Sequence, residues 1–439
     1  MSILISSRIY ESCPEVTLFA SSSLDKGPDF YLLFFVPPQP ADHGQTSKKR
    51  RRRRGQEEIP MREIEKERQM IQSIAQKSVQ KIVAPKAAEI DTRGLIPQEI
   101  VESFGRQGLL SILLPEEYGG TEGDVTSFCL VIEEVAKTSG ACSLLILAQG
   151  VGSLPLILKG SVLQKERYFR AISEKNTLAA FSLNESRLGY DGETIRTRAE
   201  RKGDSYVLNG SKAFITHGGV PGLFCVIALT HPSEGVKETS AFLVEGDSPG
   251  LTLVRREEKV GMRGTFTADL ILENCEIPAA NLLGQEGGGW SIVLNTLTVA
   301  KTAVGAQAVG IAQGALDYAS HYAQERVQFG KPIASFQAIQ FMIADMATQV
   351  EAARALVYEA AARIDDGAGA TERFSAMAKL YASESAIRVT TDAVQILGGY
   401  GYMRDYPVER MMRDAKVTQV FEGPNPVHRW LLAQDLLRG

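Results

Sequence analysis

The spacing of apolar residues changes twice along the chain, and this order limits the folds that it can adopt. Between residues 61 and 177 apolar residues repeat every three or four positions, as they do in amphipathic helices. Between 178 and 286 short apolar runs are bounded by glycine, proline or charge, as strands are. Helical spacing returns between 287 and 439. This order predicts an α+β protein of several domains, with an antiparallel or mixed sheet in the middle.

Local signals predict where these elements turn, begin and end. Asn209-Gly210, between two apolar runs, predicts a tight hairpin turn. Pro85 is expected to end the first helix, and Ser335 is expected to cap a long later one. Further strands are expected at Phe224–Leu229, Ser240–Val244 and Asp269–Leu272. On a long helix that ends at Glu325, close packing is expected at Gly305, Gly310 and Gly314.

The overall composition is that of an ordinary globular chain and excludes several classes of function. The chain has 439 residues and a net charge of -4, which argues against general affinity for nucleic acid or anionic membrane. No apolar run reaches the roughly twenty residues that a membrane-spanning helix needs. The histidines are dispersed and the cysteines form no CxxC pair, so we expect reduced thiols and no metal site. The cysteines are Cys13, Cys129, Cys142, Cys225 and Cys275.

Residues 1–60 differ in composition from the rest. They contain serine clusters, prolines and the basic run Lys48–Arg54, which repels itself and favours a disordered extension. The alternatives are a nuclear-type or nucleic-acid tag, a transit peptide, and an upstream over-extension of the reading frame. The acidic residues in this segment argue against a transit peptide. Met61 is a plausible initiator.

The motifs near the C-terminus form an unusual series. Gln395–Tyr400 ends a helical stretch on paired glycines, and the charged stretch Val408–Lys416 follows. Phe421-Glu422-Gly423 closes the series. Together these motifs resemble the C-terminal part of the acyl-CoA dehydrogenase family, flavoenzymes that desaturate acyl thioesters. The resemblance continues upstream through Glu325–Pro332 to about Met61.

The resemblance implies a three-domain architecture. We expect an N-terminal α-helical domain at residues 61–177, a β-barrel or β-sandwich domain at 178–286, and a C-terminal four-helix bundle at 287–439. No GxGxxG sequence follows a predicted strand, so a Rossmann domain is not supported.

Glu422 is the candidate catalytic base. The α-proton of a thioester is a weak acid, so its base needs a dry pocket that raises the base's pKa. The apolar Phe421 suits such surroundings, and Gly423 lets the backbone approach a substrate closely. The resemblance implies that Glu422 removes the α-proton and that its backbone N–H polarises the thioester carbonyl. Some family members keep the base at the position of Ala300, and alanine cannot serve here. The dipeptide alone would also suit a surface or helix-capping glutamate.

The stretch from Leu183 to Asp191 matches the family's Leu-Thr-Glu-Pro-x-Ala-Gly-Ser-Asp loop, which lies along the flavin and the substrate. It departs from that loop at Asn184, Ser186, Leu188 and Tyr190. Cofactor contacts are therefore expected from Leu183, Asn184, Gly189 and Tyr190. Tyr190 is also expected to alter the pocket near the phosphate or pantetheine of the substrate. The alternative is a surface loop between a helix and a strand.

Phe214-Ile215-Thr216 fits the family's aromatic-Ile-Thr segment. By resemblance, Phe214 shields one face of the flavin and the Thr216 hydroxyl bonds its N5 atom. An aromatic and an isoleucine on a strand are also common in an ordinary core.

A further group of residues is expected to reach the cofactor of a neighbouring subunit. An arginine suits a pyrophosphate, and glycines let backbone amides approach phosphates. These residues are Arg326, Phe329, Gln337, Gln395, Gly398 and Gly399. By resemblance they imply a homo-oligomer, most often a tetramer. The alternatives are a solvated ion pair for Glu325 and Arg326, and an ordinary helix stop for the glycines.

Two departures from the family bear on the ligands. Pro424-Asn425 replaces a threonine at a cofactor contact, so this contact loses a hydroxyl and a backbone donor. Lys301 stands at a substrate-contacting position where members specific for straight chains often have arginine. The acyl group is therefore left open.

The sequence thus predicts an FAD-dependent acyl-CoA dehydrogenase of the kind used in fatty acid β-oxidation. Glu422 takes the α-proton, the β-hydride passes to the flavin, and electrons pass to an electron-transfer flavoprotein, giving a trans-2-enoyl-CoA. Alternatives on the same fold are an acyl-CoA oxidase, an enoyl-CoA reductase and a non-catalytic flavin- or CoA-binding homologue. Nucleic-acid binding through Lys48–Arg54 is a further alternative. The compartment is the cytoplasm for a bacterial chain or the mitochondrial matrix for a eukaryotic one.

Overall fold

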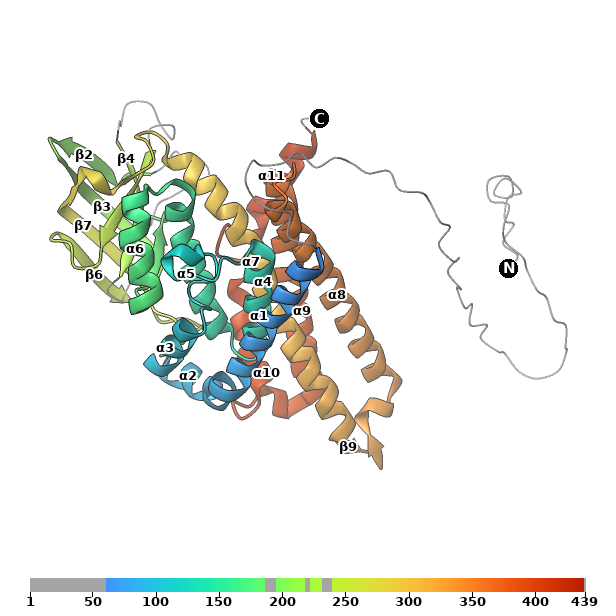
Figure 1. Cartoon of the computed structure of the whole chain (residues 1–439). Coiled ribbons are helices and arrows are strands. Elements are labelled where there is room, and N and C mark those ends of the chain that lie inside the picture. Colours follow the sequence, from blue (N-terminus) through green and yellow to red (C-terminus); the bar gives the residue numbers. More distant parts are fainter. Residues whose placement is uncertain (1–60, 186–194, 218–221, 231–238, 438–439) are drawn as a thin grey trace, which may run out of the picture. The chain divides into compact units, whose positions relative to one another are not determined.

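The computed structural model describes residues 61–185, 195–217, 222–230 and 239–437 (Figure 1). The predicted extension at residues 1–60 and the predicted contacts Gly189 and Tyr190 lie outside the described residues. Within them, helices come first, a sheet follows and helices return, as the periodicity predicts. The α+β architecture with helical N- and C-terminal parts around a central sheet is therefore confirmed.

The first helical part contains six α-helices. They are α1 (Met61–Ser78), α2 (Ala87–Arg93), α3 (Gln98–Arg106), α4 (Val125–Ala136), α5 (Gly140–Lys159) and α6 (Val162–Lys175). The prediction that Pro85 ends the first helix was wrong. The α-helix stops at Ser78, and the chain continues through a π-helical turn and the 3₁₀ turn Ala84–Lys86 into α2. Pro85 fits there because the first positions of a helical turn need no backbone N–H.

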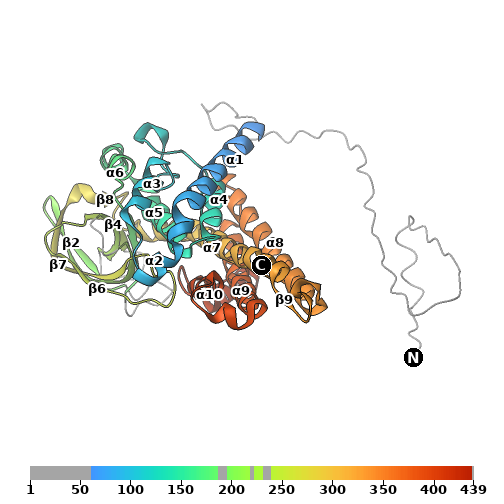
Figure 2. The ribbon, with the colours of Figure 1, turned by 90° about the horizontal axis from the view of Figure 1, so that it is seen from below.

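The central part is a mixed sheet. Its strands are β1 (Ala179–Ser182), β2 (Arg198–Lys202), β3 (Ser205–Thr216), β4 (Leu223–Leu229), β5 (Thr239–Glu245), β6 (Leu251–Arg256), β7 (Thr267–Pro278) and β8 (Leu282–Leu283). They follow the order β6-β7-β3-β2-β4-β5-β8, and β1 pairs with β4. The β1 and β2 pairings with β4 are parallel and the others antiparallel, which confirms the predicted mixed sheet. Figure 2 shows the sheet on the side of the molecule away from α8.

The hairpin predicted at Asn209-Gly210 was wrong. Strand β3 runs straight through this dipeptide, and the turn between β2 and β3 lies at Gly203, whose φ is 61°. Gly210 instead sits at a β-bulge opposite β7, where an added Cβ would lie 2.6 Å from Thr197 Cα. Bulges and tight turns both favour glycine, so the local sequence did not distinguish them.

The last part contains the longest helices. They are α7 (Gly289–Glu325), α8 (Gln337–Asp365), α9 (Thr371–Leu397), α10 (Pro407–Val417) and α11 (Asn425–Leu437). A short hairpin of β9 (Val327–Gln328) and β10 (Lys331–Pro332) joins α7 to α8. The cap predicted at Ser335 was wrong, because α8 begins at Gln337 and no side chain caps it. The Ser335 hydroxyl instead donates to the Pro332 carbonyl at 2.7 Å.

Helix α7 packs closely on α4 because two of its residues lack side chains. A Cβ added at Gly310 would lie 2.2 Å from the Glu133 carbonyl oxygen, and one at Gly314 would lie 2.0 Å from that of Lys137. At Gly305 it would lie 2.8 Å from a methyl carbon of Val357 on α8. The close packing predicted for the three glycines is therefore confirmed.

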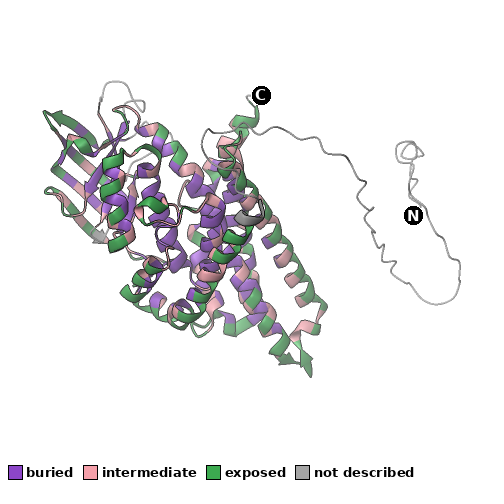
Figure 3. Ribbon diagram, in the orientation of Figure 1, coloured by how far each residue is buried: buried purple, intermediate pink, exposed green. Residues whose placement is uncertain are grey.

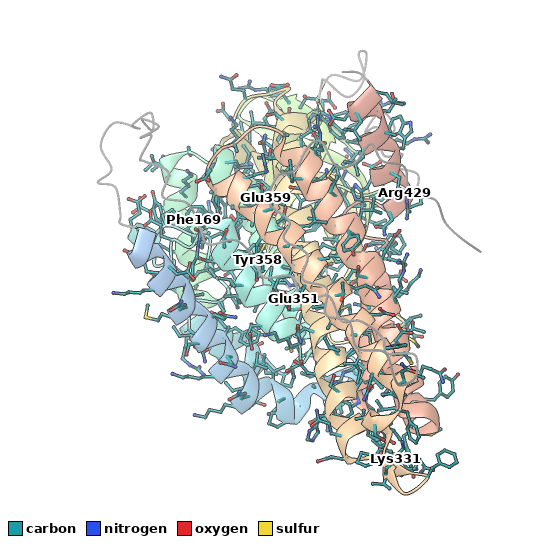
Figure 4. The ribbon with its side chains drawn as sticks, turned by 90° about the vertical axis from the view of Figure 1, so that its right-hand side faces the viewer. Phe169, Lys331, Glu351, Tyr358, Glu359 and Arg429 are labelled. Atoms are coloured by element: carbon teal, nitrogen blue, oxygen red, sulfur yellow. The ribbon has the colours of Figure 1, made fainter. Side chains whose placement is uncertain are left out.

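The buried carboxylate of Glu133, on α4, also joins α4 to α8 through hydrogen bonds. The Tyr358 hydroxyl donates to Glu133 Oε2 at 2.7 Å, and Arg354 Nε donates to Glu133 Oε1 at 2.9 Å. Figure 4 shows Tyr358 on α8, on the side toward the first helical part. These bonds fix the direction of α8 beside α7 and α9.

Two helices are apolar enough to meet the length and composition of a membrane span, contrary to the expectation from the sequence. These helices are α5 and α7, and each contains an apolar window of eighteen residues. The protein buries 89% and 83% of these windows (Figure 3). A core helix passes the same test of length and composition, and both helices line the main hydrophobic core.

Candidate active site

Glu422 lies in the turn between α10 and α11 with an unusual backbone conformation. Its φ is 53° and that of Gly423 is 88°. The left-handed region costs a residue with a side chain about 1–2 kcal/mol, and such strain concentrates at functional sites. At Gly423 an added Cβ would lie 2.9 Å from the His428 ring, so this turn also needs glycine next to Glu422.

The surroundings of Glu422 make it a stronger base than a solvated carboxylate. The residue keeps some accessible surface, but burial of its carboxylate raises its pKa to about 6. The charges of Lys379 and Lys301 oppose this rise. A carboxylate with this pKa is ionised at neutral pH and still accepts a proton readily, as a general base must.

Lys379, on α9, contacts the Glu422–Gly423 turn, and the sequence did not predict this contact. Its side chain has no accessible surface, and its Nζ donates to the Gly423 carbonyl at 2.7 Å and to Asn425 Oδ1 at 2.9 Å. Burial lowers its pKa to about 7, and the charge of Glu422 opposes this. Its position among small residues on the inner face of α9 was the only sequence signal.

Asn425, a predicted cofactor contact, has its side chain turned toward α9. It is buried, accepts from Lys379 and donates through Nδ2 to the Ser383 hydroxyl at 3.0 Å. Pro424 before it is half-buried. The structure thus brings Asn425 together with Lys379, while a cofactor contact at Pro424 and Asn425 stays a prediction.

Lys301 and His428 complete the group around Glu422. Lys301 is buried on α7, 3.7 Å from Glu372 Oε1, and burial lowers its pKa. His428 is buried on α11, and its Nε2 lies 3.2 Å from the Glu422 carbonyl oxygen. Burial lowers the His428 pKa to about 4, so the ring is neutral at pH 7. The sequence predicted Lys301 but not His428, which no local motif identifies.

The predicted flavin contacts before and on β3 lie close together. Ala213 N donates to the Asn184 carbonyl at 2.8 Å, and the buried Lys212 donates to the Leu183 carbonyl at 3.1 Å. Lys212 also pairs with Glu185 at 2.8 Å. These bonds hold the 183–185 backbone against β3.

The two side chains expected to contact the flavin ring lie at the end of β3. Phe214 has a φ of 57° and is 64% exposed, and its backbone N–H donates to Asp269 Oδ1 at 2.9 Å. Thr216 is half-buried. An exposed aromatic ring held by a strained backbone is suited to stacking on a flat ligand.

Three of the six residues predicted to reach a neighbouring subunit's cofactor line a cavity of ≈ 620 Å³ between the ends of α7 and α9. Arg326 and the glycine pair are among the residues that surround it, and Arg326 stacks on the Tyr400 ring at 5.2 Å. No atom lies within 4 Å of a Cβ built at Gly398 or Gly399. The other three predicted contacts are exposed: Phe329, Gln337 and Gln395.

This cavity lies far from Glu422 within one chain. Lys379, which contacts the Glu422 turn, and Gly398, which lines the cavity, are separated by about 28 Å of helix α9 at 1.5 Å per residue. Figure 4 shows Lys331, in the hairpin after α7, and Arg429, on α11, toward opposite ends of the helices. The structure therefore does not bring Arg326 or Gly398 to Glu422 in one chain.

The residues present fit a dinucleotide flavin. The cavity offers a guanidinium and two glycines whose amides a diphosphate can approach without a Cβ clash. Phe214 and the Leu183–Asn184 backbone offer an aromatic face and polar groups for a ring.

Family models match nearly the whole described chain. The model of the acyl-CoA dehydrogenase N-terminal domain matches residues 65–176, that of the middle domain 180–275, and that of the C-terminal domain 287–437.

Named relatives match over most of their length. Cyclohex-1-ene-1-carbonyl-CoA dehydrogenase of Geobacter metallireducens is 48% identical over 81% of this chain and 94% of the relative. An acyl-CoA dehydrogenase of Bacillus subtilis is 43% identical over 86% of this chain and 99% of the relative.

Solved structures match as well. A structure described for the electron transferring flavoprotein of Acidaminococcus fermentans matches with 44% identity and a TM-score of 0.83, over 85% of this chain and 98% of that one. Butyryl-CoA dehydrogenase from Megasphaera elsdenii matches with 40% identity and a TM-score of 0.82, over 84% and 98%. Acyl-CoA dehydrogenase complexed with FAD from Bacillus anthracis matches with 32% identity and a TM-score of 0.79, over 85% and 67%.

Proposed function

Since the chain belongs to the acyl-CoA dehydrogenase family, FAD-dependent oxidoreductases that act on a CH–CH group, we propose that it desaturates an acyl-CoA thioester to the trans-2-enoyl-CoA. The observation that carries this proposal is the Glu422 carboxylate, whose pKa burial raises to about 6 against the opposing charges of two buried lysines, Lys379 and Lys301.

Glu422 acts as the base in this proposal. Ionised at neutral pH, it takes the α-proton, and its backbone N–H donates to the thioester carbonyl as negative charge develops there. Gly423 leaves room for the substrate beside it, and Lys301 lines the pocket. FAD, when bound, supplies the two-electron oxidising capacity.

Two groups of residues would hold FAD. The ring end would contact Leu183, Asn184, Phe214 and Thr216, with Gly189 and Tyr190 of the adjoining loop. The phosphate and adenine end would contact Arg326, Phe329, Gln337, Gln395, Gly398 and Gly399 of a second copy of the chain. Pro424 and Asn425 are proposed to meet the cofactor through their backbone.

The acyl group is proposed to be compact. Relatives named for a cyclohexene carbonyl thioester share 48% and 46% identity with this chain. Another named for a cyclohexane carbonyl thioester shares 43%. A ring carbonyl thioester is therefore the first substrate to test, and a short straight chain, as in butyryl-CoA, is the second.

The yellow holoenzyme should lose its visible flavin absorbance when mixed anaerobically with its acyl-CoA, because the substrate reduces the bound flavin. The measurement is a panel of cyclohexane, cyclohexene, butyryl, branched, aromatic and long acyl-CoAs, with free CoA as the control. A yellow protein that no thioester bleaches would support the non-catalytic alternative instead.

We propose an electron-transfer flavoprotein as the electron acceptor. Its support is the match to the structure described for such a flavoprotein. Peroxide formation in air during turnover separates this proposal from an oxidase. The relatives named above come from bacteria, which favours a role in the bacterial cytoplasm, and fatty acid β-oxidation is the proposed setting for a straight-chain substrate.

The proposed domain boundaries remain 61–177, 178–286 and 287–439. In support, α6 ends at Lys175 and β1 begins at Ala179. At the second boundary, β8 ends at Leu283 and α7 begins at Gly289.

We propose a homo-oligomer, a tetramer by family resemblance, in which two copies complete each site. The argument is the helix length of about 28 Å between the Glu422 turn and the Gly398 cavity in one chain. E422Q and R326A variants should each be inactive alone. Co-expressed with different tags and purified as mixed oligomers, they should regain FAD and bleaching, because one site then combines an intact Glu422 with an intact Arg326. Mixed oligomers as inactive as the separate variants, or an active monomer, would contradict a shared site.

A further inference from the structure

The turn that carries Glu422 is held at two successive carbonyls. His428, from α11, lies 3.2 Å from the Glu422 carbonyl oxygen, and Lys379, from α9, donates to the Gly423 carbonyl at 2.7 Å. Both residues of the turn have left-handed φ values, 53° and 88°. An unfavourable backbone conformation persists only where its surroundings impose it, and these two bonds come from separate helices.

Lys379 is a buried charged side chain at a position where an apolar side chain would pack as well. It has no accessible surface, and its remaining partner, Asn425 Oδ1 at 2.9 Å, is itself held by Ser383. Within the described residues no carboxylate oxygen lies within 4 Å of its Nζ. A buried ammonium without a paired carboxylate is costly, and burial accordingly lowers the Lys379 pKa to about 7.

The Glu422 carboxylate is the acid whose charge acts on Lys379. The charges of Lys379 on α9 and Lys301 on α7 act on this carboxylate, and His428 of α11 lies against the Glu422 backbone carbonyl. Lys301 also has Glu372 beside it at 3.7 Å, whereas Lys379 has Glu422 alone as a charged counterpart.

We propose that Lys379 is a positioning residue of the reaction, which fixes the Glu422–Gly423 turn through the Gly423 carbonyl and supplies the positive charge that keeps the Glu422 carboxylate ionised. The proposal rests on the proposed function, in which Glu422 is the base. Helix α9 then contributes to catalysis through Lys379, and separately lines the cavity with its last residues before Gly398.

The direction of the pH effect follows from the charges. An ammonium near a carboxylate favours the ionised form, so loss of Lys379 raises the Glu422 pKa further above its present value of about 6. The base is active when ionised, so the rate of flavin bleaching rises with pH through that pKa. Lys379, with its own pKa lowered to about 7, keeps most of its charge at the Glu422 midpoint near 6 and loses it at higher pH, so its effect belongs to the lower part of this range. His428, with its pKa lowered to about 4, stays neutral across this range, and Lys301 is unchanged in every variant.

The test compares single-turnover bleaching of the FAD-loaded variants from pH 5 to 9. In K379M the midpoint of the rise should move to higher pH by about one unit. The limiting rate should fall on the order of 100-fold, because the turn loses its anchor. K379R should return the midpoint toward that of the wild type but not the rate, since a guanidinium keeps the charge and not the geometry. R388M, which removes an exposed charge from the same helix, is the matched control and should change neither.

Further variants separate the possible failures. K379Q keeps a donor for the Gly423 carbonyl without the charge. It should therefore move the midpoint as K379M does, but with a smaller loss of rate than K379M. It also replaces K379M in the test if K379M does not fold. E422Q/K379M should be no slower than E422Q, because Lys379 acts through Glu422. An active E422Q would overturn the proposed base. An inactive E422Q together with wild-type midpoint and rate in K379M and K379Q would overturn only the role of Lys379.

Discussion

Replacing Glu422 with glutamine should abolish bleaching of the flavin by acyl-CoA while FAD stays bound. The amide has the shape of the carboxylate but cannot accept the α-proton, and loss of a general base costs about 10²–10⁴-fold in rate. Anaerobic stopped-flow absorbance with the best substrate of the panel measures the effect. The thermal midpoint should not fall, because burial raises the pKa of this carboxylate and its ionised form destabilises the folded chain above that pKa.

The matched control for this substitution is E351Q. Glu351 lies on the exposed side of α8 (Figure 4), and its loss removes a carboxylate without touching the turn. It should leave the bleaching rate unchanged. Equal rates in E422Q and the wild type would refute the assignment of the base, whatever the substrate.

Replacing Gly314 with valine should cause the largest loss of stability of any single change considered for this chain. A Cβ there would lie 2.0 Å from the Lys137 carbonyl oxygen, so α7 and α4 must move apart. Overpacking of this severity against backbone costs about 3 kcal/mol or more. Because α7 also carries Lys301, the shift should disturb the site as well. Thermal or urea unfolding of the holoenzyme measures the change.

Gly369 provides the control for that prediction. Nothing lies within 4 Å of a Cβ built there. G369A should therefore change the free energy of unfolding by no more than about 0.5 kcal/mol. A stable G314V with normal activity would show that α4 and α7 can separate without consequence.

The order of elements could be predicted because periodicity is a local property. Helices such as α9 are long enough for the helical spacing to stand out, and β4 and β5 are buried runs bounded by polar residues. The prediction of a hairpin turn at Asn209-Gly210 was wrong for a physical reason. The same dipeptide suits a turn and a bulge, and pairing with β7, a strand far along the chain, decided between them.

The candidate site could be predicted where its residues stand in a contiguous motif or, like Lys301, at a position that the family resemblance marks. Phe421-Glu422-Gly423 and the 183–185 segment are of this kind. Lys379 meets the Glu422 turn across 44 residues of sequence, and a lysine among small residues on a helix gives no sign of that contact. His428 lies nearer but acts through its ring on a backbone carbonyl, which no residue pattern encodes.

The length of helix α9 also limits which insertions and deletions this chain can accept during evolution. It bears Lys379 near its start and passes into Gly398 at its end, and it is 27 residues long. Adding or removing one residue between them would swing the glycine pair about 100° around the axis relative to the base. Insertions and deletions within α9 should thus be tolerated only when their length is close to a whole number of helical turns. The loops at either end of α9 can vary in length.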